Sequence, residues 1–356
     1  MVAKPPLRFL GMLVAALAVF TSAHGAMSTA ERLTILWERV LRQTEYGKVA
    51  DAEATARLAL DIAPGSASAW AVAAVAYGAG SDAGPTRARA AAERAVSIDP
   101  GNARAHYAMG LVDYAHGDAA SAETHFRRAT ELCDGFARAH GMQAWALWDL
   151  GRHDEALAAT GEAIRIEPRG FYWHQNLAIM LGELGELEPA LAESALALEL
   201  APDARWKAVA HNNRAYLYAY AGQFTQGLSE AEAAVSLEPD DPAMLDTVGF
   251  LSALCGEAAR AEGYLRQALA GGYPSLPKLA YVLALRGDVN GARGALLKSR
   301  DDLMGPQASM DSLYAAGLAY DRLGEPEVTR RIFRQATGLK PSHPWSQAMR
   351  EYLLGT

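Results

Sequence analysis

The stretch ARAHYAMGLVDYAHGDAASAETHFRRATELCDGF, residues 103–136, holds one complete copy of a pattern that recurs along the chain. In its middle stands Gly117, and beyond it two alanines, Ala122 and Ala129, lie seven residues apart. Glycine adopts the left-handed conformation that ends many helices at little cost. Small residues seven apart lie on one helix face, where a neighbouring helix can approach closely. The stretch therefore predicts two packed helices, A and B, joined by a turn at Gly117.

The same marks return with a period centred on 34 residues. The second alanine is one of nine small residues at intervals of 36, 34, 34, 34, 37, 34, 31 and 37: Ala59, Ala95, Ala129, Ala163, Ala197, Ala234, Ala268, Ser299 and Ala336. Another small residue precedes each by seven positions, except that Thr329 stands there in the last copy. The mid-copy glycine occurs in eight copies, as Gly47, Gly117, Gly151, Gly185, Gly222, Gly256, Gly287 and Gly324. A proline five residues after the second small residue ends helix B in six copies. A fixed period of this length is the signature of a repeat protein.

The repeated residues resemble the tetratricopeptide repeat family. In residues 103–136 the family's pattern is carried by His106, Gly110, Gly117, Ala122, Phe126 and Ala129. The resemblance covers residues 33–343 in nine units and implies an all-α fold, an α-solenoid wound as a right-handed superhelix of about nine helix-turn-helix units. We expect an irregularity near residues 271–306, where an interval shortens to 31 and glycines and prolines predict a kink or a shortened helix. Residues 344–356 are expected to form a C-terminal capping helix.

The first residues are predicted to lie outside the repeats. Lys4 and Arg8 precede an uncharged apolar run, residues 9–20, which is followed by small and polar residues. This order is typical of a secretory signal peptide, expected here as residues 1–25 with a lead-in at 26–32, and twelve apolar residues are too few to span a bilayer. The alternatives are an uncleaved anchor or a misassigned start codon. We therefore expect export to the periplasm or exterior of a bacterium, without membrane insertion after cleavage.

Charge and composition narrow the classes of partner. The chain has a formal charge of −8, and loss of residues 1–25, which hold Lys4 and Arg8 and no acids, leaves 31 basic residues against 41 acidic ones, a charge of −10. Such a balance disfavours nucleic acid and anionic membrane surfaces. No HExxH, GxSxG, P-loop or helix-opening GxGxxG motif occurs. We therefore expect a protein that is not an enzyme and has no cofactor.

The histidines and cysteines offer few chemical sites. Four histidines occupy one position in consecutive helices A: His106, His140, His174 and His211. Stacked helices lie about 8–10 Å apart, too far for these side chains to share one metal ion, so we interpret them as packing residues. A pH-sensing role for this column stays open as an alternative. Cys133 and Cys255 are expected to be free, buried thiols, because about four units separate them.

A binding surface is predicted on the inner face. The family resemblance implies that helices A line that face, so the residue after the small residue of helix A points inward. That column and its neighbours one turn away give the predicted partner-binding residues Tyr107, Leu111, Tyr114, Trp145, Trp148, Ile179, Tyr216, Tyr220, Phe250, Tyr281 and Tyr314. A charged and polar rim is expected from Arg104, Arg138, Asn212, Asp246, Asp311 and Arg322. In the alternative, a tightly wound superhelix buries this column as core.

These features predict a non-enzymatic scaffold that binds a protein or peptide partner in an aromatic groove. We expect a role in cell-envelope assembly, secretion or polysaccharide export. The alternative is a regulatory or substrate-recruiting subunit of an enzyme complex, which would use the same groove. No sequence feature indicates an oligomeric state.

Overall fold

The computed structural model describes residues 27–80, 84–305 and 308–355, and every regular element in these ranges is an α-helix. The expected signal peptide, residues 1–25, lies outside the described residues. The chain divides into two compact units, unit 1 (Met1–Ile166) and unit 2 (Glu167–Thr356). In the described part of the chain no helix is both long and apolar enough to cross a membrane.

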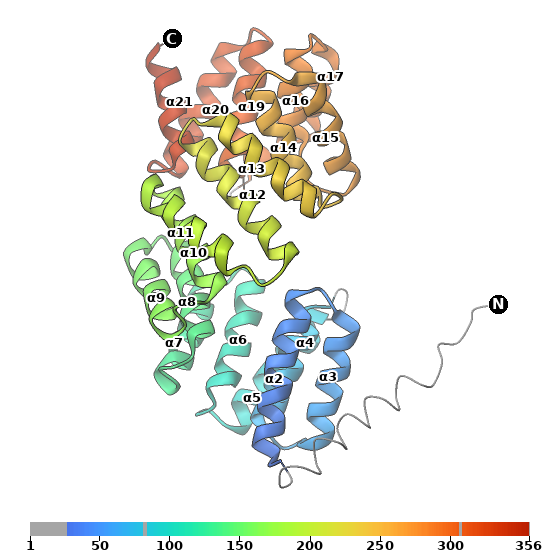
Figure 1. Cartoon of the computed structure of the whole chain (residues 1–356), viewed down its shortest axis with the longest axis vertical. Coiled ribbons are helices and arrows are strands. Elements are labelled where there is room, and N and C mark those ends of the chain that lie inside the picture. The colour runs from blue at the N-terminus through green and yellow to red at the C-terminus, as the bar shows by residue number, and fades with distance from the viewer. Residues whose placement is uncertain (1–26, 81–83, 306–307, 356) are drawn as a thin grey trace, which may run out of the picture. The chain divides into compact units, whose positions relative to one another are not determined.

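Unit 1 is a run of antiparallel helix pairs, coloured blue to green in Figure 1. Its helices are α2 (Thr29–Glu45), α3 (Val49–Ile62), α4 (Ala67–Gly78), α5 (Gly84–Ile98), α6 (Ala103–Ala115), α7 (Ala119–Leu132), α8 (Ala137–Asp149) and α9 (His153–Ile166). Even-numbered members are helices A and odd-numbered members helices B. Helices α3, α5 and α7 each pack on their own A helix and on the A helix of the next pair, and α9 packs on α8, as expected of a solenoid.

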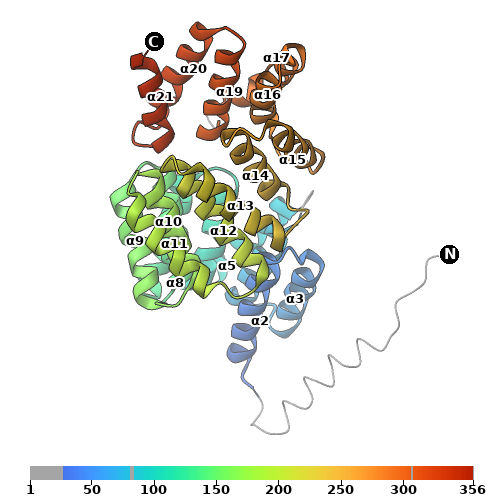
Figure 2. The same cartoon turned by 45° about the horizontal axis from the view of Figure 1, so that its top comes forward.

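Unit 2 continues with the same kind of pair, green to red in Figure 1. Its helices are α10 (Phe171–Glu183), α11 (Leu187–Leu200), α12 (Ala204–Tyr220), α13 (Phe224–Leu237), α14 (Pro242–Leu254), α15 (Ala258–Ala270), α16 (Leu276–Leu285), α17 (Val289–Lys298), α18 (Arg300–Met304), α19 (Met310–Arg322), α20 (Pro326–Leu339) and α21 (Pro344–Gly355). The last helix, α21, packs against α19 and α20, and Figure 2 shows the three side by side.

The turns within the pairs form as the glycines predict. All eight mid-copy glycines have positive φ, between 64° and 87°. Other residues enter this region of backbone conformation only at a cost in free energy. At Gly117, φ is 79° and the backbone N–H donates to the carbonyl of Tyr114 at the end of α6. The prediction that these glycines end helix A is confirmed.

The small residues seven apart form the contact between paired helices. Ala122 and Ala129 of α7 are completely buried, and their counterparts in the other copies are buried as well, Ala88 being 1% exposed. Gly110 of α6 serves the same close approach, because a Cβ added there would lie 2.6 Å from Cε1 of Phe126. Thr329 departs from the pattern, and its buried hydroxyl donates to the carbonyl of Gly317 at 3.0 Å.

The expected irregularity takes the form of shortened helices. Helices α16 and α17 are each 10 residues long, whereas the other paired helices have 12 to 17. Gly272, with φ of 86°, turns the chain before α16, and Pro277 lies in the first turn of that helix. The short helix α18 then fills the longer connection to α19.

Candidate partner-binding surface

Unit 1 has an open apolar hollow of about 610 Å³ between the C-terminal halves of three A helices. It is lined from α2, α4 and α6, together with the start of α5, by Thr44, Glu45, Ala74, Val75, Gly78, Ala79, Pro85, Ala88, Leu111, Val112, Tyr114, Ala115 and His116. Leu111 and Tyr114, both in the predicted set, are half-buried on its wall. We refer to this feature as the unit 1 hollow.

The polar groups at the hollow are already bonded within the chain. The Thr44 hydroxyl donates to the carbonyl of Leu41 at 2.8 Å, and His116 Nδ1 lies 2.6 Å from the carbonyl of Val112. Glu45 pairs with Arg138 of α8. Burial raises the pKa of the Tyr114 hydroxyl, and its hydrogen bond to Asp149 raises it further. The hollow is therefore suited to an apolar group rather than to an ion.

Tyr107 is not open surface. It packs against Trp37, Phe126 and Phe136 with ring centroids 5.0–5.7 Å apart, and burial raises its pKa to about 12. Trp37 and Phe136 come from α2 and from the N-cap of α8, so this cluster joins helices that are far apart in sequence. The alternative of a buried column therefore holds at this position.

The two tryptophans of α8 have different surroundings. Trp145 is half-buried. Trp148 is buried and stacks on the ring of His153 at the start of α9, with ring centroids 4.3 Å apart. Neither lines the unit 1 hollow.

In unit 2 the chain fills its own aromatic column. Trp345, at the start of α21, is 3% exposed and stacks on Tyr314 with a centroid distance of 4.5 Å. Its ring also meets Tyr220, Phe250 and Phe224, at 5.9, 6.2 and 6.5 Å. The predicted residues Tyr220, Phe250 and Tyr314 are therefore core contacts of the C-terminal helix rather than the lining of an open groove.

Further contacts hold the C-terminal segment in place. Lys340 Nζ lies 2.9 Å from a carboxylate oxygen of Glu183 on α10. His343 packs edge-on against Tyr220, and burial lowers its pKa to about 4. The backbone N–H of Trp345 donates to His343 Nδ1 at 3.2 Å. These contacts join the last two helices to α10 and α12 within unit 2.

A buried ion cluster lies beside this aromatic core. Lys278 of α16, 2% exposed, contacts carboxylate oxygens of Asp246 on α14 and Asp311 on α19. Its Nζ lies 3.5 Å from the Tyr216 hydroxyl and 5.2 Å from the ring centroid of Phe250. The expectation that Asp246 and Asp311 form a solvent-facing rim is wrong, because Asp246 is fully buried and the side chain of Asp311 is 15% exposed.

Lys278 and the two carboxylates change one another's pKa values. Burial alone would lower the pKa of Lys278, but the two carboxylates raise it well above its ordinary value. Burial raises the pKa of Asp246 despite Lys278. For Asp311, burial is outweighed by Lys278, and the pKa is lowered. Lys278 is thus a cation on which two buried carboxylates depend.

The remaining predicted residues of unit 2 are also largely covered. Burial raises the pKa of the Tyr216 hydroxyl, which lies at the ion cluster. Tyr281 is buried and Ile179 is half-buried. Of the predicted partner-binding set, only Leu111 and Tyr114 line the unit 1 hollow.

The histidine column connects helices to the preceding turns. Nε2 of His106, His140 and His174 lies 3.0–3.2 Å from the carbonyl six residues earlier in each case. Nδ1 of His174 and of His211 lies 2.7 Å from a glutamate of the paired B helix. His106 and His174 are buried, so the packing interpretation is confirmed for them. Within the residues that the structure describes, no three His, Cys, Asp or Glu side chains converge as metal ligands.

The cysteines are free thiols, but Cys133 is exposed. The prediction that it is buried is wrong, because Cys133 is the C-cap of α7 and lies beyond the helix face that contacts α6. Cys255 is partly buried at the end of α14, and burial raises its pKa.

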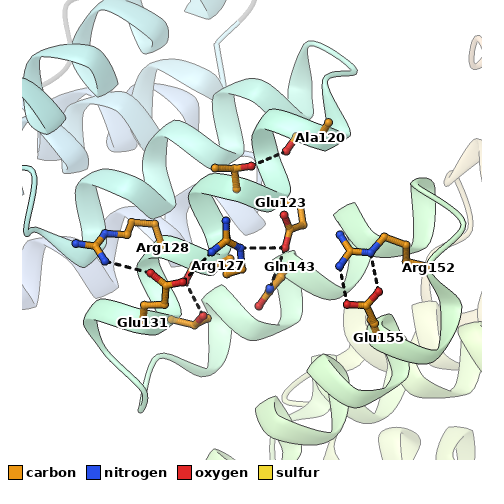
Figure 3. Close-up of polar contacts among 10 residues, drawn as sticks. Ala120, Glu123, Arg127, Arg128, Glu131, Gln143, Arg152 and Glu155 are labelled. Carbon is orange, nitrogen blue, oxygen red and sulfur yellow. Dashed lines mark hydrogen bonds and ion pairs between the residues drawn. The ribbon is translucent and has the colours of Figure 1, made fainter.

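The outer helix α7 carries a charged surface, shown in Figure 3. Glu131 pairs with Arg127 at 2.8 Å and with Arg128 at 3.1 Å. Arg127 also approaches Glu123, which accepts from Gln143 of α8 at 3.3 Å. The exposed pairs of Glu131 contribute about 0–1 kcal/mol each. This surface therefore offers sites for control substitutions that leave the hollow intact.

Most of the residues that shape these sites lie outside the predicted partner-binding set. Val75 belongs to the inward column, but Thr44, Glu45 and His116 stand at helix ends that the column does not include. Trp345 falls in the expected C-terminal capping helix, residues 344–356, and Lys278 belongs to no predicted set. The signal that could have found Lys278 is a lone lysine one turn before Tyr281 in an otherwise apolar helix.

Comparisons with known proteins agree with the repeat pattern. The tetratricopeptide repeat family model matches residues 137–169 and 311–343, which cover the pair α8–α9 and all but the first residue of the pair α19–α20. Comparison with curated protein sequences found no match.

Two solved structures share the architecture. One is the Cut9–Hcn1 hetero-tetramer of the APC/C, at 14% identity and a TM-score of 0.57 over 65% of this chain and 45% of that chain. This chain therefore spans less than half of that protein's length. The other is a tetratricopeptide repeat protein from Parabacteroides merdae ATCC 43184, at 16% identity and a TM-score of 0.51 over 70% of this chain and 97% of that chain. At these identities the likeness shows the fold alone.

The fold of this family is a scaffold for protein interactions. The family model matches two helix pairs of the chain, and within the described residues the other pairs, α4–α5 apart, also have a glycine with positive φ in their turn. The helix pairs α8–α9 and α19–α20 thus match the tetratricopeptide repeat, and the likeness to solved structures shows that the chain has an α-solenoid fold.

Proposed function

We propose that this chain is a non-enzymatic, exported scaffold that binds a protein or peptide partner in the unit 1 hollow, in cell-envelope assembly, secretion or polysaccharide export. The observation that carries the proposal is the hollow itself, an apolar recess of about 610 Å³ on the A helices of unit 1. Recesses of roughly 300–1,000 Å³ are the size at which proteins hold ligand groups.

The lining favours a large apolar side chain of the partner. Leu111 and Val75 supply aliphatic wall, and Tyr114 supplies an aromatic face. The charged group on the wall, Glu45, is paired with Arg138, so a charged ligand would find no free counter-charge there. An aliphatic or aromatic anchor in a desolvated recess is the arrangement that carries most of the affinity in protein interfaces.

Unit 2 has a supporting part in this proposal. Its aromatic column is covered by Trp345 and the Lys278 cluster, so binding is assigned to the hollow and stability to these contacts. The proposal thus reduces the predicted binding set to Leu111 and Tyr114, with Val75 beside them.

Peptide selection on the purified chain tests the binding site. Peptides selected from a random library are titrated calorimetrically against the wild type, Leu111→Glu, Tyr114→Ala and the control Arg128→Ala on the charged surface of α7. We expect the two hollow variants to bind at least about tenfold more weakly, a loss of about 1.4 kcal/mol, and the control to bind unchanged. Equal affinities for all four folded proteins would refute the hollow as the site.

Export has a separate test. Expression of the full chain in a bacterial host, followed by fractionation and mass spectrometry of the N-terminus, should give a periplasmic or extracellular protein that begins at His24 or Ala26. This expectation rests on the charged, apolar and small-residue order of residues 1–25. A cytoplasmic protein that retains Lys4 and Arg8 would contradict the export proposal without touching the binding site.

A further inference from the structure

Unit 1 contains a pair of histidines that face each other across a helix pair. His106 of α6 is 8% exposed, and its Nδ1 lies 3.1 Å from Nδ1 of His125 on α7. The two rings stack with their centroids 5.3 Å apart. The other ring nitrogen of His106, Nε2, lies 3.0 Å from the carbonyl of Pro100. Both nitrogens of this buried ring are therefore engaged by groups of unit 1.

The chemistry of these partners fixes where the protons lie. A carbonyl oxygen can only accept, so His106 Nε2 carries a hydrogen and donates it to Pro100. In the neutral ring, His106 Nδ1 is then an acceptor, and the hydrogen shared by the pair belongs to His125 Nδ1. The contact between the two rings thus depends on one nitrogen of the pair remaining unprotonated.

A charged group beside the pair contacts His125 at Nε2, the ring nitrogen that does not face His106. Asp113 of α6 is 4% exposed and lies 3.8 Å from His125 Nε2, and Arg89 of α5 pairs with the same carboxylate at 3.1 Å. Burial lowers the pKa of His125, Asp113 opposes this change, and His106 adds to it.

Other charged groups nearby are engaged elsewhere. On α7, Glu123 is held by Arg127 and by Gln143 of α8. On α8, Arg138 pairs with Glu45, and Asp149 bonds to Tyr114. Helix α4, which packs against α6, carries no charged residue.

Two later helix pairs carry a different group at the same position. His174 Nδ1 lies 2.7 Å from Glu193, and His211 Nδ1 lies 2.7 Å from Glu230, each glutamate being 19 residues after its histidine as His125 is after His106. A carboxylate accepts a hydrogen from a protonated imidazole, whereas a second imidazolium would place N–H against N–H. The α6–α7 pair therefore lacks the acid-tolerant partner that α10–α11 and α12–α13 possess.

We propose that the His106–His125 pair is a pH-sensitive joint between α6 and α7, which loosens unit 1 when both rings are protonated. Full protonation sets two N–H groups and two positive charges against each other across a 3.1 Å contact. The lowered pKa of His125 has the matching sign: as pH falls below the ordinary histidine value, the unfolded chain takes up protons before the folded chain, so stability is lost.

The test compares thermal unfolding at pH 7.5 and pH 5.0 for the wild-type chain, His125→Glu and His125→Gln. His125→Glu recreates the contact seen at His174, and His125→Gln can donate to a neutral His106 or accept from a protonated one. We expect the wild-type Tm of unit 1 to fall on acidification by at least about 3 °C more than that of either variant. Equal falls in all three proteins would overturn the proposal.

A measurement on the wild type keeps the test decisive if the variants fold poorly. Long-range ¹H–¹⁵N correlation spectra of the imidazole rings at pH 7.5 should show His106 with its hydrogen on Nε2 and His125 with its hydrogen on Nδ1. The opposite tautomers would remove the basis of the joint, as would two rings that are both protonated at this pH.

Discussion

The ion cluster of unit 2 gives the sharpest test of how this solenoid is held together. In Lys278→Met the methionine fills a similar volume but leaves Asp246, which is fully buried, and Asp311 without their cation. Breaking a buried ion pair by removing one partner costs about 3–5 kcal/mol, because an uncompensated charge remains. For a unit of this size that loss corresponds to a fall in Tm of about 6–20 °C.

The assay is urea unfolding followed by circular dichroism at pH 7.5 and pH 4.5, with Lys298→Met as the control. Lys298 is an exposed lysine of α17 in the same unit, and its replacement should change the free energy of unfolding by less than about 0.5 kcal/mol. Unit 2 should carry the loss in Lys278→Met, so if the two units unfold separately only one transition should shift.

The pH dependence follows from the signs of the pKa shifts. In the wild type Lys278 lowers the pKa of Asp311, so this carboxylate stabilises the fold above its ordinary pKa, and that contribution is lost as pH falls. In the variant we expect burial to raise the pKa values of both carboxylates. The loss in free energy of unfolding relative to the wild type is then full at neutral pH and shrinks as the carboxylates become protonated. A loss in free energy of unfolding below about 1 kcal/mol at pH 7.5, or an equal loss at pH 7.5 and pH 4.5, would refute the reasoning.

Two further predictions concern packing. Trp345→Ala should destabilise unit 2 by about 3–5 kcal/mol, because the ring contacts Tyr314 and three other aromatic residues. The control is Leu354→Ala, since Leu354 is 89% exposed on the same helix. Equal Tm values for the two variants would contradict a filled aromatic column. Gly110→Ala should cost about 1–3 kcal/mol in chemical denaturation, because its Cβ meets Phe126. Gly161→Ala, with open space around it, should be neutral or stabilising, and a loss in Gly161→Ala as large as in Gly110→Ala would argue against the steric explanation.

Local marks in the sequence were enough to predict the helix pairs. The mid-unit glycines, the alanines seven apart and the prolines after helix B each act within one pair or between adjacent pairs. Gly117 and Ala122 therefore have the conformation and burial that their spacing predicts. The shortened α16 follows in the same way from Gly272 and Pro277.

The sequence by itself determined the period, the all-α architecture and which side chains share the inner column. Tertiary structure alone decided that Tyr220, Phe250 and Tyr314 are covered by Trp345 and that Leu111 and Tyr114 line an open hollow. The physical reason is that the curvature of a solenoid is the sum of small rotations between neighbouring pairs. Within unit 2, those rotations bring together residues that are several helix pairs apart in the sequence, such as Glu183 and Lys340. No local sequence pattern encodes such a contact.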